Sequence, residues 1–91
     1  MASNTEEQGL RVWAAATWRW AEQEDGDGRP EPAAEGFRAI AAAMPERPEP
    51  IDRLAAASRA AGASAQAIIL ARRAFAMAPD NAILNNNLAA A

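Results

Sequence analysis

Residues 48–81 read PEPIDRLAAASRAAGASAQAIILARRAFAMAPDN, and this stretch decides the fold. Prolines lie near both of its ends, and Gly62 separates two runs of helix-forming residues. Because proline is tolerated in the first turn of a helix, the first run predicts a helix over residues 49–61 that ends just before Gly62. The second run predicts a helix over about residues 65–78, which Pro79 stops. The stretch therefore predicts a helical hairpin.

The second helix of this hairpin has apolar residues on two faces. At about 100° per residue, Ile68 and Phe75 share one face with Ala71, while Leu70 and Met77 lie on another. A helix with two apolar faces needs neighbours on two sides. Small side chains at such contacts let backbones approach closely. The alanines expected at these contacts are Ala67, Ala71 and Ala74, whereas Ile69, Arg72, Arg73 and Ala76 are expected to point outward.

Three further helices are predicted outside this hairpin. Residues 1–5 read as a disordered leader, followed by a first helix over about residues 6–23 and an acidic loop over 25–32. A second helix is expected near residues 32–44. Ser64 is the expected cap of the helix over 65–78, and a fifth helix is expected from Asp80 or Asn81 to Ala91. Residues 6–91 are expected to form one all-α domain of five helices in antiparallel hairpins.

The spacing within residues 48–81 resembles the tetratricopeptide repeat, a family of helical hairpins that stack into right-handed arrays. The resemblance is good over residues 48–91 and weak over 6–47, where Trp13 and Trp20 have the aromatic spacing of an earlier first helix. It implies a concave binding surface built from the first helix of each hairpin, and no chemistry. A closed five-helix bundle is the alternative. The positions that match in residue and spacing are Leu54, Gly62, Ala67, Ala74 and Pro79.

Composition argues against catalysis. The chain has 91 residues, and hydrophobic residues make up 51% of it, but most of these are alanine, so only a thin core is possible. It contains no Cys, His, Lys or Tyr, which removes the usual nucleophiles, general bases and soft metal ligands. We therefore expect a non-enzyme without a cofactor or metal.

Charge and hydropathy exclude two classes of partner. Nine basic residues stand against twelve acidic ones, a net charge of −3, which offers no basic field for nucleic acid. No segment has the length and apolarity of a membrane span, and the acidic start lacks the features of a secretory signal. A cytoplasmic protein is expected.

Acidic residues gather around the first predicted loop. Gln23, Asp25, Asp27 and Gly28 have the spacing of the start of a calcium-binding EF-hand loop, but Gln23 stands where that loop needs its first acidic ligand. Ala34 likewise replaces the final glutamate. The preferred interpretation is a solvated charged loop.

The three tryptophans divide into two groups. Trp13 and Trp20 are seven residues apart on one face of the first predicted helix, and both are expected in the core. Trp18 points elsewhere. It is either covered by the leader or the acidic loop, or exposed for binding.

One stripe of side chains is predicted to form a partner-binding face. Asp52 and Arg59 share a face of the helix over 49–61, distinct from the face that carries Ile51. The repeat spacing brings Trp18 and Asn86 to equivalent positions in the neighbouring helices. Trp and Arg are enriched in binding hot spots. The predicted partner-binding residues are therefore Trp18, Asp52, Arg59 and Asn86.

These features favour a non-catalytic scaffold module that binds a protein or peptide. The alternatives are a self-associating structural subunit, the terminal part of a longer repeat array, or an accessory domain of an enzyme. The fifth helix carries apolar residues, and no hairpin partner follows it in this sequence, so we expect either that the sequence is a truncated part of a longer protein or that self-association buries this helix. Its apolar residues are Ile83, Leu84 and Leu88.

Overall fold

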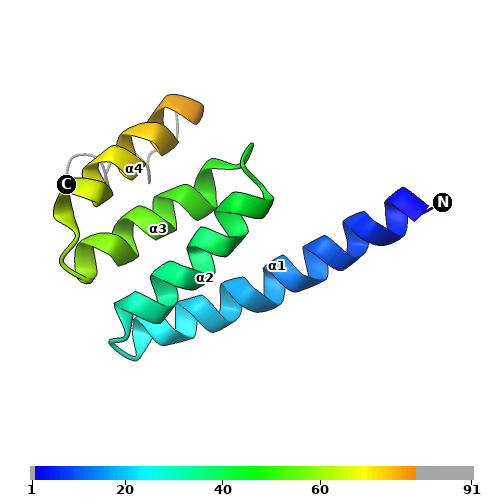
Figure 1. The fold of residues 1–91 in the computed structure, drawn as a ribbon, viewed down its shortest axis with the longest axis horizontal. Coiled ribbons are helices and arrows are strands. Elements are labelled where there is room, and N and C mark those ends of the chain that lie inside the picture. Colours follow the sequence, from blue (N-terminus) through cyan, green and yellow to red (C-terminus); the bar gives the residue numbers. More distant parts are fainter. Residues whose placement is uncertain (1, 80–91) are drawn as a thin grey trace.

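The computed structural model describes residues 2–79. They form four α-helices, each antiparallel to the next along the chain (Figure 1). The helices are α1 (Ala2–Gly26), α2 (Pro30–Ala43), α3 (Pro48–Ala60) and α4 (Ser64–Met77). Each helix packs against the next along the chain: α1 on α2, α2 on α3 and α3 on α4. The all-α prediction is confirmed for these residues. The predicted fifth helix lies outside the described residues.

Glycines end two of the helices in the same way. Gly28 and Gly62 have φ angles of +80° and +93°, in the left-handed region where glycine carries no steric penalty. At the end of α3, the Ala63 amide donates to the Ser58 carbonyl at 2.8 Å, and the Gly62 amide donates to the Arg59 carbonyl at 3.0 Å. This pair of bonds is a Schellman motif, which satisfies carbonyls that the helix leaves unpaired. The predicted stop at Gly62 is confirmed.

Three helix boundaries differ from those predicted. Helix α1 begins at Ala2 rather than near Glu6 and continues to Gly26, so the loop that follows is short. Helix α2 begins at Pro30, because proline already has a helical φ angle and lacks the amide that a first residue would leave unpaired. Ser64 is the first residue of α4 rather than its cap, and the capping residue Ala63 makes no side-chain hydrogen bond.

The core lies along the three interfaces between consecutive helices. Phe37 and Ile40 of α2 and Ile51 of α3 are the largest fully buried side chains. Leu54, Leu70 and a set of alanines make up the rest of the core, and the alanine contacts let adjacent helices lie close together. The predicted contact residues Ala67, Ala71 and Ala74 are all buried, and Ile69 is exposed as expected. The orientation assigned to α4 is confirmed only in part, because Met77 is exposed and Ile68 and Phe75 are half-buried.

Gly36 of α2 lies against Trp20 and Ala21 of α1. A Cβ atom at this position would lie 3.0 Å from the Cβ of Ala21 and 3.1 Å from Cζ3 of Trp20. Glycine in mid-helix costs helix stability relative to alanine. Because Gly36 has no side chain, the Trp20 ring of α1 can pack directly against the backbone of α2.

The prediction that Trp13 and Trp20 belong to the core is wrong. Trp13 is 40% exposed and Trp20 is 47% exposed. Helix α1 is much longer than α2, so its N-terminal half extends past the rest of the molecule (Figure 1). Apart from the contact of Trp20 with Gly36 of α2, residues 2–79 leave the face that carries these two rings open. The buried side of α1 is formed instead by Ala14 and Ala21.

Candidate functional site

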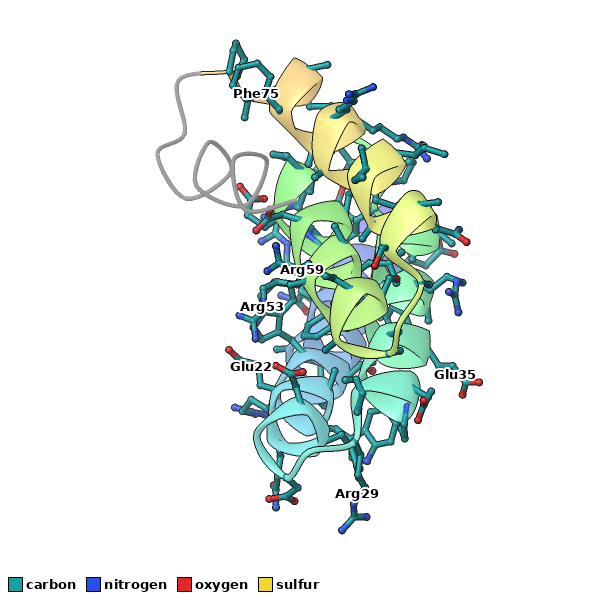
Figure 2. All side chains as sticks on the ribbon, turned by 90° about the vertical axis from the view of Figure 1, so that its left-hand side faces the viewer. Glu22, Arg29, Glu35, Arg53, Arg59 and Phe75 are labelled. Atoms are coloured by element: carbon teal, nitrogen blue, oxygen red, sulfur yellow. The ribbon has the colours of Figure 1, made fainter. Side chains whose placement is uncertain are left out.

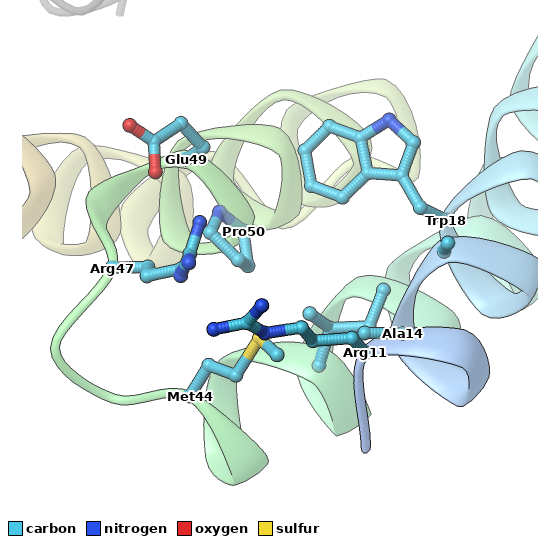
Figure 3. Close-up of a pocket in the computed structure, with 9 residues that line it drawn as sticks. Arg11, Ala14, Trp18, Met44, Arg47, Glu49 and Pro50 are labelled. Atoms are coloured by element: carbon cyan, nitrogen blue, oxygen red, sulfur yellow. The ribbon is translucent and has the colours of Figure 1, made fainter. Parts of the chain in front are cut away.

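A groove of about 610 Å³ opens between the middle of α1, the end of α2 and the start of α3. Ile40 of α2 and Met44, the residue after α2, form an apolar floor. Trp18 of α1 stands at one side (Figure 3). Pro50 contributes a rigid apolar surface from α3. An open groove with an apolar floor can take an apolar side chain from a partner.

The turn between α2 and α3 shapes one rim of the groove. The Met44 amide still donates to the Ile40 carbonyl, and the Arg47 amide donates to the Met44 carbonyl at 3.1 Å, which folds the chain back sharply. Pro48 then starts α3 at its first position. Because of this turn, Arg47 and Glu49 lie beside the groove.

Charged groups surround the apolar floor unevenly. Arg11, Arg47 and Glu49 all line the groove, two positive charges against one negative. Figure 3 shows the guanidinium groups of Arg11 and Arg47 on the same side, with the Trp18 ring across from them. Within residues 2–79, neither arginine forms an ion pair. The groove therefore offers two unpaired guanidinium groups next to an apolar surface.

Trp18 is held in place by contacts from two other helices. Its ring meets Phe37 of α2 edge to face, with ring centroids 5.0 Å apart and an interplanar angle of 76°. The Arg53 guanidinium of α3 lies 5.2 Å from the Trp18 ring centroid and 5.1 Å from that of Phe37. Edge-to-face aromatic pairs and cation–π contacts are both attractive. Together they fix the orientation of the ring that borders the groove.

Arg53 is itself anchored by Glu22 of α1. Its Nη1 donates to Oε2 of Glu22 at 3.1 Å, and the pair is partly open to solvent. Figure 2 shows Glu22, Arg53 and Arg59 along one side of the molecule. The hydrogen bond joins α1 directly to α3, two helices that are not consecutive in the chain. We call Trp18, Phe37, Arg53 and Glu22 the Arg53 cluster.

The predicted partner-binding residues are not brought together as one stripe. Trp18 is half-buried and borders the groove, covered by Phe37 and Arg53 rather than by the leader or the acidic loop. Asp52 is only 3% exposed, so it lies in the interior and not on a binding face. Arg59 is half-buried on α3 and does not line the groove. Asn86 lies outside the described residues.

Three groove residues were missed by the sequence analysis. Arg11 and Arg47 are single arginines in helix and turn segments, and Met44 is the last apolar residue before a proline. Nothing in their local spacing marks them as neighbours. The one available signal is the run of three prolines, Pro45, Pro48 and Pro50, which indicates a tight rigid turn next to the end of α2.

The acidic residues near the first loop do not form a cluster for metal binding. Glu22 and Glu24 belong to α1 rather than to the loop. Glu22 pairs with Arg53, and Oε2 of Glu24 lies 3.6 Å from Nη1 of Arg29. In the part of the chain that the structure describes, no three acidic, histidine or cysteine side chains are grouped so that they could hold a metal ion.

The length and apolarity needed to cross a membrane are not combined in any helix of residues 2–79. A scan against protein-family models finds no family that matches this chain, and a search of curated proteins finds no match either.

Proposed function

We propose that this chain is a non-catalytic interaction module that binds a peptide segment of another protein in the groove between α1, α2 and α3. The observation that carries the proposal is the groove itself, which combines an apolar floor with two guanidinium groups that have no ion-pair partner in residues 2–79. An arginine without an ion-pair partner beside an apolar surface can form a charge-assisted hydrogen bond to a carboxylate.

The helical arrangement supports a tetratricopeptide-like architecture. Consecutive antiparallel hairpins, the glycine turn at Gly62 and the buried alanines of α4 agree with the repeat pattern. In such a stack, α1 and α3 are the first helices of their hairpins, and both contribute to the groove. Apart from Trp18, the side chains that would do the binding differ from the stripe expected from the spacing.

The composition of the groove defines the class of peptide. Two arginines and one glutamate favour a segment with a local excess of negative charge, and Met44, Ile40 and Trp18 favour a large apolar residue beside it. A uniform polyanion would leave the apolar floor unused. The expected ligand is therefore a short segment in which an acidic residue neighbours an aromatic or aliphatic one.

Selection from a library of random displayed peptides tests this proposal. We expect enrichment of sequences that place Asp or Glu next to a large apolar residue. Arg11→Ala and Arg47→Ala should each weaken binding of a selected peptide by about tenfold, because each removes a charge-assisted hydrogen bond. Added salt should weaken binding further.

Arg72→Ala is the matched control, since Arg72 is exposed on α4, away from the groove. It should leave the affinity unchanged. Failure to enrich any peptide, or equal losses for Arg72→Ala and Arg47→Ala, would contradict the proposal.

A further inference from the structure

Helix α1 carries an exposed seam on the side that faces away from the groove. Its members recur with alternating spacings of three and four residues, the heptad pattern that lets two helices pack along their length. Every one of them is exposed. We call them the α1 seam: Glu6, Gly9, Trp13, Ala16, Trp20 and Gln23.

The α1 seam alternates small and large side chains in a self-complementary order. If a second α1 runs antiparallel with Trp13 opposite Ala16 of the other copy, then Trp20 falls opposite Gly9. The same register places Glu6 opposite Gln23, a polar pair at each end. Because the two helices are identical, each of these contacts occurs twice with roles exchanged, as a two-fold axis requires.

Two parallel α1 helices in register would not pair large side chains with small ones in this way. That arrangement would place Trp13 opposite Trp13 and Gly9 opposite Gly9, so large residues would collide and small ones would leave voids. Protein interfaces are packed as densely as interiors, so both faults are unfavourable. The order of side-chain sizes therefore selects the antiparallel orientation.

The rest of the molecule leaves the α1 seam accessible. Ala14 and Ala21 form the buried side of α1, and Trp18 points to α2 and α3. Trp20 lies with part of its ring against Gly36 and is otherwise open to solvent. The N-terminal half of α1, which carries Glu6, Gly9 and Trp13, projects beyond the other helices (Figure 1).

We propose that two copies of this chain associate through the α1 seam, with their α1 helices antiparallel. The six seam residues span about 25 Å of helix at 1.5 Å per residue. An interface of one helix pair is smaller than that of an obligate dimer, so we expect a reversible dimer that dissociates on dilution. The exposed tryptophan rings of both copies become covered.

The dimer keeps both grooves open. Arg11, Ala15 and Trp18 line the groove and lie on the opposite side of α1 from the seam. Two grooves in one particle would allow two-site attachment to a partner that carries repeated peptide segments.

Mass measurement by light scattering over a dilution series tests the proposal on the full chain. The wild type should show twice the mass of one chain at high concentration and fall toward one chain on dilution. Ala16→Arg should halve the mass at high concentration, because the new side chain cannot fit opposite Trp13. Ala15→Arg is the matched control, an exposed neighbouring alanine on the groove side, and should remain a dimer.

Gly9→Gln provides a second variant that keeps the fold. A Cβ at Gly9 has no atom within 4 Å, and replacing glycine favours the helix, so the single chain should melt at a higher temperature while the dimer is lost. A wild type with the mass of one chain at every concentration would overturn the proposal. A dimer that survives both Ala16→Arg and Gly9→Gln would do the same.

Orientation is tested with paired cysteine variants, since the chain has no cysteine of its own. A mixture of Glu6→Cys and Gln23→Cys should form a cross-linked dimer with a short bismaleimide, and neither variant should do so alone. Efficient cross-linking of Glu6→Cys with itself would show a parallel pair and overturn the antiparallel seam. These readouts do not depend on peptide binding, so they fail or succeed separately from the proposed function.

Discussion

The two helical hairpins of this protein solve the same packing problem with different side chains. In the α3–α4 hairpin, alanines and medium-sized residues such as Ile51 and Leu54 close the interface, and the two helices have similar lengths. In the α1–α2 hairpin, one helix is much longer than the other. Its interface depends on Phe37, on a glycine contact at Gly36 and on the Arg53 cluster.

The difference shows that apolar spacing identifies a face but does not determine whether that face is covered. Ala71 and Trp13 each belong to a set of apolar residues that repeats at helical spacing within its own helix. Ala71 is buried because it lies on a face of α4 that is packed in the core, whereas Trp13 is exposed although its neighbour Ala14 is buried, because Trp13 lies on the opposite side of α1 from the groove. Which side of a helix receives a neighbour decides the outcome.

The largest expected effect comes from Phe37→Ala. Phe37 is 1% exposed and is the biggest fully buried side chain, so its loss leaves a cavity where α1, α2 and α3 meet. We expect a loss of about 3–5 kcal/mol in the free energy of unfolding, enough to unfold much of a small domain. Urea denaturation followed by circular dichroism measures it. Phe75→Ala, at a half-buried site of α4, should cost clearly less, and equal losses would place Phe37 outside the main core.

Overpacking the α3–α4 hairpin should have the next largest effect. Ala71→Leu adds a branched side chain where only an alanine fits, at an expected cost of about 1–3 kcal/mol. The melting temperature should fall by several degrees. Ala76→Leu is the control, since Ala76 is exposed on the same helix. An unchanged melting temperature for Ala71→Leu would show that this hairpin is looser than its alanine contacts indicate.

The Arg53 cluster gives a smaller effect that is specific to the α1–α2 side. Arg53→Ala removes two cation–π contacts and the hydrogen bond to Glu22, with an expected cost of about 1 kcal/mol at this partly open site. Arg53→Lys keeps the charge but loses the planar stacking group, so it should recover only part of the stability. Full recovery by lysine in thermal denaturation would mean that charge alone, and not stacking, matters here.

The smallest effect is expected at Ile69. This residue is 67% exposed on α4, so Ile69→Gln should change the free energy of unfolding by less than about 0.5 kcal/mol. Chemical denaturation of both proteins side by side provides the measurement. A large loss would reveal that something covers the outer face of α4 in solution.

Much of the helical framework could be predicted from the sequence. The prolines and glycines predicted where α3 begins and where it ends, because these residues act through their own backbone geometry. The alanine contacts of α4 followed from periodicity. The boundaries of α1 and α2 were less accurate, since polar and acidic residues near a helix end are compatible with both helix and loop.

The site could be predicted only in part. Trp18 was identified as a candidate and does border the groove, but Asp52 is buried and Arg59 lies elsewhere on α3. Arg11, Arg47 and Met44 come from three different segments. Their proximity depends on the crossing of α1 over the α2–α3 turn, which no local pattern encodes.

The sequence by itself determined that this protein is helical, where its described hairpins turn, and that alanine sets the spacing between α3 and α4. These properties follow from backbone conformation and side-chain size, which each residue carries regardless of its neighbours. Only the tertiary structure decided which tryptophan is packed, that Asp52 is interior, and that Arg11 and Arg47 share a groove with Met44. Burial and proximity are properties of pairs of elements, and they depend on the relative lengths and crossing of helices far apart in the chain.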